Sequence, residues 1–274
     1  MSIKMIPGGK TQIMGILNVT PDSFSDGGRN DSTESAIAAA QLMIADGADM
    51  IDVGGESTRP GAEPVSLEQE IARVIPVITC LVNEGVQVSI DSYKTQVVEA
   101  ALNAGASMVN DINGLRSDGM AELVAGYGVP VCIMHMQGTP KDMQADPSYT
   151  DVVGEVRDFL RQRADFAVSK GVCEKDILID PGIGFGKTVE HNLELIARIA
   201  EFRELGLPLL VGHSRKSFIA GVLDLPVDER LSATVAVSAY LALAGVEVLR
   251  VHDVRENREA VEMMVALSPY MRVI

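Results

Sequence analysis

The chain has 274 residues, of which 47% are hydrophobic, and 38 acidic against 23 basic side chains give it a net charge of −15. This composition supports a sizeable buried core and excludes disordered and collagen-like classes. Nucleic acids and anionic membranes are bound by clustered positive charge, so we expect neither as a partner. The three cysteines show no C-x-x-C spacing and the N-terminal residues form no apolar segment. Both features predict a cytoplasmic protein without a disulfide framework.

Eight short apolar segments rich in β-branched residues predict strands, and helical patterns fill most intervals between them. Ser66 with Gln69 forms a capping box, and Asp31 with Glu34 approximates one, so helices should begin there. Glycines such as Gly47 are expected to end helices in a left-handed conformation. The strands are expected at 12–17, 49–53, 86–90, 107–109, 129–134, 177–179, 209–211 and 247–251.

Strand and helix alternate to the end of the chain, which predicts parallel β/α structure in one domain spanning 1–274. Nearly every strand ends in a polar residue, and a doubly wound sheet would need them only at a switch point. Eight polar strand ends favour a (β/α)₈ TIM barrel, whose active site lies at the carboxyl ends of the strands. The apolar stretch 233–249 contains polar interruptions and predicts a buried helix running into the last strand rather than a membrane span. The polar strand ends are Asn18, Asp52, Asp91, Asn110, His135, Asp180, Ser214 and Arg250.

Asp91, Asn110 and Asp180 each follow an apolar strand, and together they suit a planar heterocycle whose N–H groups pair with carboxylates. Each also has a structural explanation. The alternative for Asp91 is an N-cap of the next helix, and for Asp180 and Asn110 it is a place in a turn, where both residue types are common.

Four cationic side chains lie at or just after the ends of the last two strands. Arg215 and Lys216 begin a helix, where a lysine opposes the helix dipole, so a local function is indicated. Arg250 and His252 are two residues apart and share one strand face, which favours an anion site. The alternatives are a solvated lysine and a salt bridge from Arg250 to a carboxylate.

Two long polar loops, 18–32 and 54–66, are expected at the active-site face, where long loops commonly clamp ligands. Asn18 is a candidate oxygen ligand for Mg²⁺, which takes few protein ligands and several phosphates and waters. The four histidines show no short metal-ligand spacing.

The motifs at the strand ends resemble, in order and over nearly the whole chain, those of the bacterial dihydropteroate synthases. That family joins 6-hydroxymethyl-7,8-dihydropterin diphosphate to p-aminobenzoate and releases pyrophosphate in folate synthesis. The resemblance implies a Mg²⁺ cofactor, a homodimer and sensitivity to sulfonamides. The helix from Ala233 to Ala244 either supplies the dimer interface or packs on the barrel. The motifs are ILNVTPDSFSDGG, IDVGGESTRPGA, SIDSYK, VNDI, MHMQGTP, DPGIGFGK, HSRKSF and LRVHDV.

The same resemblance assigns roles to individual residues. Arg59, Lys216, Arg250 and His252 would be the catalytic group. The pterin ring would be bound by Asp91, Asn110, Asp180 and Lys216, and the diphosphate by Arg250, His252 and Mg²⁺ on Asn18. The p-aminobenzoate pocket would be formed by Thr58, Arg59, Pro60, Phe185 and Ser217.

Three other functions compete with this one. A pterin-dependent methyltransferase would not need the cationic residues or the two long loops. A silent pterin-binding paralogue would show eroded loops, and a barrel aldolase using Lys216 would not need the carboxylates.

Overall fold

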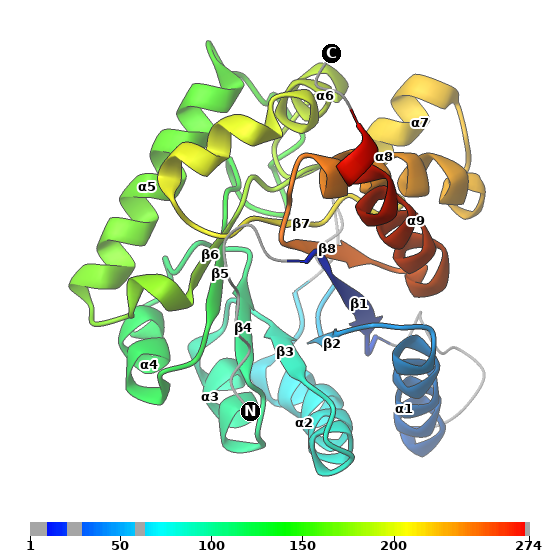
Figure 1. The fold of residues 1–274 in the computed structure, drawn as a ribbon. Coiled ribbons are helices and arrows are strands. Elements are labelled where there is room, and N and C mark those ends of the chain that lie inside the picture. The colour runs from blue at the N-terminus through cyan, green and yellow to red at the C-terminus, as the bar shows by residue number, and fades with distance from the viewer. Residues whose placement is uncertain (1–9, 21–28, 58–63, 272–274) are drawn as a thin grey trace.

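Eight parallel strands lie at the centre of the computed structural model, which describes residues 10–20, 29–57 and 64–271 (Figure 1). The sheet has the order β6-β5-β4-β3-β2-β1-β8-β7, and every named pair is parallel. Each predicted strand is present, and its ends differ from the prediction by at most two residues. The strands are β1 (Gln12–Asn18), β2 (Met50–Gly54), β3 (Val88–Asp91), β4 (Met108–Asp111), β5 (Val131–Met134), β6 (Ile177–Asp180), β7 (Leu210–Val211) and β8 (Val248–Val251).

The barrel is nearly closed between its first and last strands in the sheet order. An isolated parallel bridge joins Ile179 of β6 to Leu209, just before β7. The N–H of Ile179 also donates to the carbonyl oxygen of Pro208 at 3.0 Å. The expected (β/α)₈ TIM barrel is therefore confirmed.

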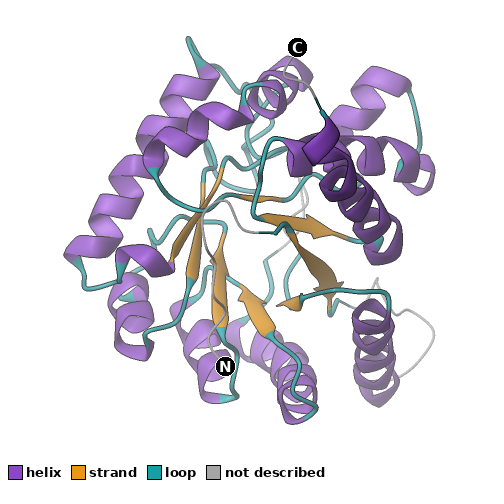
Figure 2. Ribbon diagram, in the orientation of Figure 1, coloured by secondary structure: helices purple, strands orange, loops and turns teal. Residues whose placement is uncertain are grey.

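Helices surround the strands on all sides, as Figure 2 shows. The α-helices are α1 (Arg29–Ala45), α2 (Leu67–Asn83), α3 (Thr95–Asn103), α4 (Met120–Tyr127), α5 (Val152–Ser169), α6 (Val189–Ala197), α7 (Ser217–Leu223), α8 (Leu231–Leu243) and α9 (Val254–Leu267). Short 3₁₀ segments are η2 (Glu174–Asp176), η3 (Ile199–Leu205), η4 (Val227–Glu229) and η5 (Ser268–Tyr270).

The helix boundaries follow the local sequence in most places. Ser66 caps α2, and its side chain and that of Gln69 form the predicted capping box. Gly47 has a φ of +101°, the left-handed conformation expected after α1. The Asp31 cap is wrong, because α1 begins at Arg29 and Asp31 lies within its first turn. An acidic residue in the first turn is also favoured by the helix dipole, so the pattern alone did not identify the cap.

The buried apolar side chains fall into two main compartments. The larger fills the space between the strands and the surrounding helices. The smaller fills the barrel interior, because alternate residues of a strand point to opposite faces. Its members are Met14, Met50, Met108, Cys132, Leu178, Leu210 and Val248.

Helix α8 is the apolar helix predicted before the last strand. It buries Thr234, Ser238 and Leu241, whereas Tyr240 and Leu243 are 43% and 48% exposed. The expectation of a buried helix therefore holds for one side only. Within the described ranges, no helix is both long and apolar enough to cross a membrane.

Candidate active site

The barrel interior changes from apolar to polar within two residues along four strands. Met50 is followed by Asp52, Met108 by Asn110, Leu178 by Asp180 and Val248 by Arg250. Residues two apart in a strand share a face, so these polar side chains lie directly above the apolar layer. The carboxyl ends of the barrel therefore carry a polar layer, made of Asp52, Asn110, Asp180 and Arg250.

Arg250 occupies the middle of this layer and joins three strands. Its Nε donates to Asp52 Oδ2 and its Nη2 to Asp91 Oδ2, both at 2.6 Å. The amide of Asn110 donates to the same Asp52 oxygen at 2.9 Å. Only 17% of the Arg250 side chain is exposed, and Asp52 is fully buried. The buried ion pairs hold the guanidinium in one place beneath the mouth of the barrel.

The carboxyl group of Asp91 has an unusually high affinity for its proton. Burial raises its pKa from 3.8 to about 7, although the charge of Arg250 acts in the opposite direction and Asp52 adds to the increase. A carboxyl group in this range changes its charge near neutral pH, which is a common property of functional sites.

Asn18 lies at the end of β1, beside Gly54 of β2. A Cβ atom placed on Gly54 would lie 3.7 Å from Asn18 Oδ1 and 3.5 Å from Asp91 Oδ2. The glycine therefore leaves both oxygens uncovered by a side chain of β2. No group of three His, Cys, Asp or Glu side chains that could hold a metal ion is found among the described residues.

Asp180 and Lys216 form the opposite part of the site. Asp180 is 4% exposed, and its Oδ1 accepts the N–H of Gly182 at 2.7 Å. Burial lowers the pKa of Lys216 to about 8, while the negative charge of Asp180 acts against that decrease. The Lys216 ammonium donates to the carbonyl of Ile183 and lies 4.5 Å from the centre of the Phe185 ring. Lysine, aspartate and aromatic ring thus meet where the β6 and β7 loops adjoin.

His252 follows β8 directly, and its Nδ1 lies 3.0 Å from Ser214 Oγ, which joins it to the loop after β7. Ser217 is exposed at the first position of α7, after Lys216 at the N-cap. Thr58, Arg59 and Pro60 lie outside the described residues. The structure therefore brings together Asn18, Asp91, Asn110, Asp180, Phe185, Lys216 and Arg250 around one end of the barrel, with His252 and Ser217 on adjoining loops.

The structure also tests the structural explanations of these residues. Asp91 is no helix cap, because Lys94 precedes α3 and Asp91 binds Arg250. Asp180 does support a turn through Gly182, and Arg250 does form salt bridges. Lys216 is not a freely solvated lysine, since its ammonium binds a backbone carbonyl. These local contacts orient the side chains, which still lie at the carboxyl ends of the barrel strands.

Two features of the site were missed in the sequence. Asp52 was recognised as a polar strand end but given no role, although Arg250 and Asn110 both bind it. Its position two residues after Met50 was the available signal. Lys187 is 3% exposed, and its Nζ lies 3.0 Å from His135 Nδ1 and donates to the Phe185 carbonyl at 2.9 Å. Lys187 ends the DPGIGFGK motif, but no local pattern indicated that its side chain is buried.

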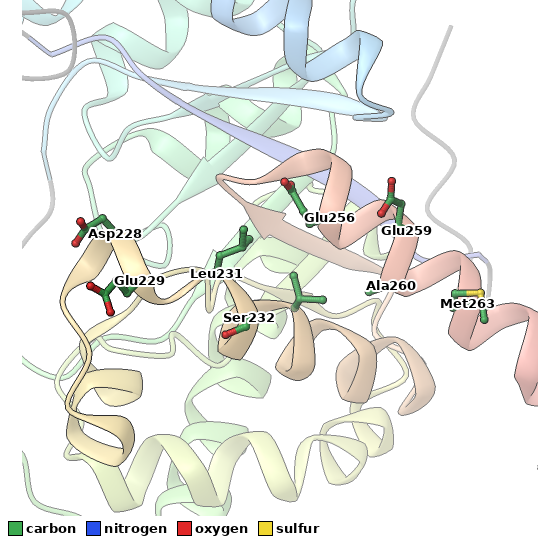
Figure 3. Close-up of a pocket in the computed structure, with 9 residues that line it drawn as sticks. Asp228, Glu229, Leu231, Ser232, Glu256, Glu259, Ala260 and Met263 are labelled. Atoms are coloured by element: carbon green, nitrogen blue, oxygen red, sulfur yellow. The ribbon is translucent and has the colours of Figure 1, made fainter.

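A separate hollow of about 650 Å³ lies on the outside of the barrel, between η4, α8 and α9 (Figure 3). Its lining combines carboxylates and apolar side chains without a lysine or arginine. Among the residues that the structure describes, the lining offers no lysine or arginine to an anionic ligand, in contrast to the barrel mouth. The lining residues are Asp228, Glu229, Leu231, Ser232, Val235, Glu256, Glu259, Ala260 and Met263.

A parallel barrel with buried carboxylates, a lysine and an arginine at its carboxyl ends defines an enzyme of the TIM-barrel class. Residues 14–252 match the family model described as pterin binding enzyme. The dihydropteroate synthase of Escherichia coli K12 is 48% identical over 255 residues, covering 93% of this chain and 90% of that protein.

Solved structures agree with these matches. The chain is similar to Yersinia pestis dihydropteroate synthase in a sulfonamide drug complex, with a TM-score of 0.91, 43% identity and 96% of each chain covered. It is also similar to Xanthomonas albilineans dihydropteroate synthase with 4-aminobenzoic acid, with a TM-score of 0.90, 43% identity, and 95% and 94% of the two chains covered. The chain belongs to the dihydropteroate synthase family of pterin-binding enzymes, and the resemblance in its motifs is confirmed.

Proposed function

We propose that this transferase condenses 6-hydroxymethyl-7,8-dihydropterin diphosphate with p-aminobenzoate, giving 7,8-dihydropteroate and pyrophosphate. The observation that carries the proposal is the polar layer at the barrel mouth, where a buried arginine lies between carboxylates contributed by separate strands. A ring with several N–H groups and a charged tail needs both kinds of partner in one place.

The pterin ring would be bound by Asp91, Asn110, Asp180 and Lys216. Asp180 is suited to accept hydrogen bonds from an amino-pyrimidine edge, because Gly182 engages only Oδ1. Lys216 is oriented by the Ile183 carbonyl and by the Phe185 ring. Buried, preoriented groups lose little entropy when a planar ligand binds, so this arrangement favours tight ring recognition.

The diphosphate would be bound by Arg250 and His252. Its negative charge would compete with Asp52 and Asp91 for the guanidinium, so binding would loosen the Arg250–Asp91 pair and leave Asp91 available to the ring. These cations would stabilise the charge that develops on the departing pyrophosphate, and Asp91 and Asp180 would favour positive charge on the ring.

The residues present fit a Mg²⁺ ion held by Asn18. One amide oxygen, with the remaining positions left to phosphate and water, suits an ion that takes few protein ligands. When bound, Mg²⁺ would neutralise charge on the diphosphate.

The p-aminobenzoate would be positioned by Phe185 and Ser217, together with Thr58, Arg59 and Pro60. Holding the aryl amine next to the reacting carbon supplies much of the catalysis, because it converts an encounter between two molecules into a local step. The amine nitrogen forms a bond to the methylene carbon, the C–O bond to pyrophosphate breaks, and the nitrogen releases one proton to solvent, so no protein nucleophile is required. Lys216 would act through hydrogen bonding, and borohydride should therefore trap no adduct on it.

We also propose a homodimer of single-domain chains located in the cytoplasm. Apolar side chains that are exposed on α8 and α9, among them Leu243 and Met263, support a subunit interface on this side of the barrel. Cys80, Cys132 and Cys173 are free thiols, which accords with a reducing compartment.

The experiment is pyrophosphate release by purified protein given the dihydropterin diphosphate and Mg²⁺, with and without p-aminobenzoate. We expect release that depends on p-aminobenzoate, with 7,8-dihydropteroate as the product. Pterin binding without such turnover would contradict the proposal and favour a silent pterin-binding protein or a methyltransferase.

A further inference from the structure

Two buried ionisable side chains, Lys187 and His135, take no part in the proposed reaction. Lys187 is 3% exposed and His135 6%, and the Lys187 Nζ lies 3.0 Å from His135 Nδ1. The second partner of this Nζ is the carbonyl oxygen of Phe185, which accepts from it at 2.9 Å. Lys187 therefore joins the loop after β5 to the backbone that carries Phe185.

Residues 181–187 connect β6 to the start of α6, and we call them the Phe185 loop. Four successive carbonyl oxygens of this loop each accept a hydrogen bond from a different side chain. Of these four donors, only Lys187 is buried, so water can replace each of the others more easily than it can replace Lys187. The pairs are Lys216 with Ile183, Gln144 with Gly184 at 2.8 Å, Lys187 with Phe185, and Tyr149 with Gly186 at 2.7 Å.

The Phe185 loop lies directly on the backbone of the loop after β5. A Cβ atom at Gly182 would lie 1.9 Å from the His135 carbonyl oxygen, and one at Gly186 would lie 2.5 Å from that of Gln137. Both glycines also have a positive φ, +68° and +63°, so neither position admits a side chain. Close packing thus fixes the backbone on both sides of Phe185, and the Lys187 contact fixes the carbonyl between them.

The ring of Phe185 points to the site from this fixed backbone. Its centre lies 4.5 Å from the Lys216 Nζ. The carbonyl and the side chain of Phe185 leave the same Cα atom, so a carbonyl held on one side limits the positions of the ring on the other. Lys187 therefore influences the ring without contacting it. The apolar group against which the ring packs is formed by Ile112, Met134, Met136 and Met143.

Stability alone does not explain a lysine at this position, because burying an amine is costly and an apolar side chain avoids that cost. Burial lowers the pKa of Lys187 to about 7, although the charge of Asp180 acts in the opposite direction. Burial also lowers the pKa of His135 well below 6.5, and the charge of Lys187 adds to that decrease. The imidazole is therefore neutral and can accept at Nδ1, and the amine keeps N–H donors in either charge state. The contacts of Lys187 thus persist whether or not it is charged.

We propose that Lys187, aligned by His135, is a positioning residue that holds the Phe185 carbonyl and so places the Phe185 ring for p-aminobenzoate. The inference rests on the proposed function, because it takes Phe185 as a wall of the p-aminobenzoate pocket. Neither Lys187 nor His135 needs to touch a substrate. The family resemblance assigned no role to either residue.

The test compares Lys187→Met with Tyr149→Phe. Methionine is similar to lysine in length and suits a buried site, but it leaves the Phe185 carbonyl without its donor. Tyr149→Phe keeps the ring and removes the donor to Gly186, the next carbonyl of the same loop. Tyr149 is partly exposed, so water can replace its hydroxyl. Tyr149→Phe is therefore the matched control for the loss of one hydrogen bond to the loop.

We expect Lys187→Met to raise the KM for p-aminobenzoate about tenfold, and Tyr149→Phe to raise it less than about twofold. The Kd for the dihydropterin diphosphate should rise less than about threefold in both variants. Burial raises the pKa of Asp180, but Lys216 and the Gly182 N–H oppose that increase more than Lys187 does, so the main partners of this carboxylate remain. An equal KM for p-aminobenzoate in the two variants, or a parallel loss of affinity for both substrates, would overturn the proposal.

A second pair of variants tests the alignment of Lys187 by His135. Asparagine at position 135 keeps an acceptor, because its Oδ1 is the same number of bonds from the main chain as Nδ1 of histidine, whereas leucine keeps none. Both substitutions remove the edge-to-face contact of the imidazole with Phe159, so the two variants are matched for packing. We expect His135→Leu to raise the KM for p-aminobenzoate at least about threefold and His135→Asn to stay within about twofold of wild type. Equal KM values in these two variants would contradict the role of His135.

A measurement without substrate separates this inference from the proposed function. The Phe185 N–H donates to the Gly182 carbonyl at 3.1 Å, and its hydrogen exchange should be faster in Lys187→Met than in wild type and unchanged in Tyr149→Phe. Unchanged exchange in Lys187→Met would contradict the structural part of the inference. If exchange behaves as expected but wild type shows no p-aminobenzoate-dependent turnover, the proposed function is refuted and the role of Lys187 in the Phe185 loop stands.

Discussion

The barrel interior contains two layers that share the same strands and differ in almost every chemical property. In the lower layer, Met50, Met108, Leu178 and Val248 are fully buried or nearly so and pack against one another. Two residues further along, the same strands carry the polar layer of Asp52, Asn110, Asp180 and Arg250. The backbone is continuous through both layers, so the difference arises from side-chain chemistry alone.

The contrast between the two layers indicates which residues stabilise the fold and which bind ligand. The lower layer stabilises the barrel through apolar burial and close packing. The polar layer contains a fully buried carboxylate, Asp52, and a nearly buried arginine, and groups of this kind are costly to bury. We therefore expect substitutions in the lower layer to reduce stability without changing ligand affinity, whereas every substitution in the polar layer should reduce ligand affinity.

The largest effect is expected for Arg250→Met, which removes the cation of the polar layer. Asp52 and Asp91 would remain buried without their partner, and the free energy of unfolding should fall by about 3–5 kcal/mol. Affinity for the dihydropterin diphosphate should fall at least about tenfold, because charge-assisted contacts are lost. Denaturant unfolding and calorimetry measure the two quantities.

The matched control is Arg157→Met, which breaks a surface pair with Glu204 at 2.9 Å, where Glu204 is 67% exposed. Its free energy of unfolding should change by no more than about 1 kcal/mol. If Arg157→Met lowered the free energy of unfolding as much as Arg250→Met does, the effect would come from removing any arginine. It would then not depend on the position of Arg250 in the polar layer.

The second comparison uses two residues of β4. Met108→Ala removes a fully buried side chain of the lower layer and should lower the free energy of unfolding by about 2–5 kcal/mol, with the KM values unchanged. Asn110→Ala should weaken binding of the dihydropterin diphosphate by roughly tenfold through a lost hydrogen-bonding amide. Steady-state kinetics and urea titration distinguish the two. Similar profiles for both variants would mean that the layers are not functionally separate.

A smaller effect is expected in the pH dependence of activity. Burial lowers the pKa of Lys216 to about 8, so the ammonium loses its proton just above neutral pH and no longer balances Asp180. The value of kcat/KM for the dihydropterin diphosphate should then fall as the pH rises through about 8. In Lys216→Arg the charge persists, and the decline should move to higher pH. An identical decline in both proteins would assign it to another group.

The smallest expected effect is a pH-dependent difference in stability. Burial raises the pKa of Asp91 from 3.8 to about 7, so the folded protein holds this proton more tightly than the unfolded chain does. The resulting stabilisation is complete below pH 3.8 and is lost as the pH rises through about 7. The free energy of unfolding of wild type, minus that of Asp91→Asn, should therefore decrease over this range. A difference that increases with pH would contradict the raised pKa.

The barrel could be predicted because its signals are local. Each apolar segment is short, flanked by polar residues and followed by a helical pattern, so all eight strands were located within one or two residues. The start of α1 was missed because acidic residues favour several positions of a first helical turn. The exposed side of α8 was missed because its composition is apolar all round, so no polar stripe marked the outer face.

The site was predictable residue by residue but its contacts were not. Asp91, Asp180 and Arg250 stood out as polar residues at strand ends. Their pairing depends on which strands are neighbours and how far each side chain reaches across the barrel. Arg250 and Asp52 are separated by 198 residues in sequence, and no local pattern reports their contact. Lys187 was missed for the same reason, since it lies in the loop after β6 and its partner His135 follows β5, 52 residues earlier in the sequence.

The central claim is that the polar layer binds the pterin while the layer beneath it only supports the barrel. It is tested most directly by calorimetric titration of the dihydropterin diphosphate, with Mg²⁺, into wild type, Asp180→Asn and Met108→Ala. We predict that Asp180→Asn weakens binding by about tenfold or more, whereas Met108→Ala stays within about twofold of wild type. Equal losses in the two variants, or no loss in Asp180→Asn, would contradict the claim.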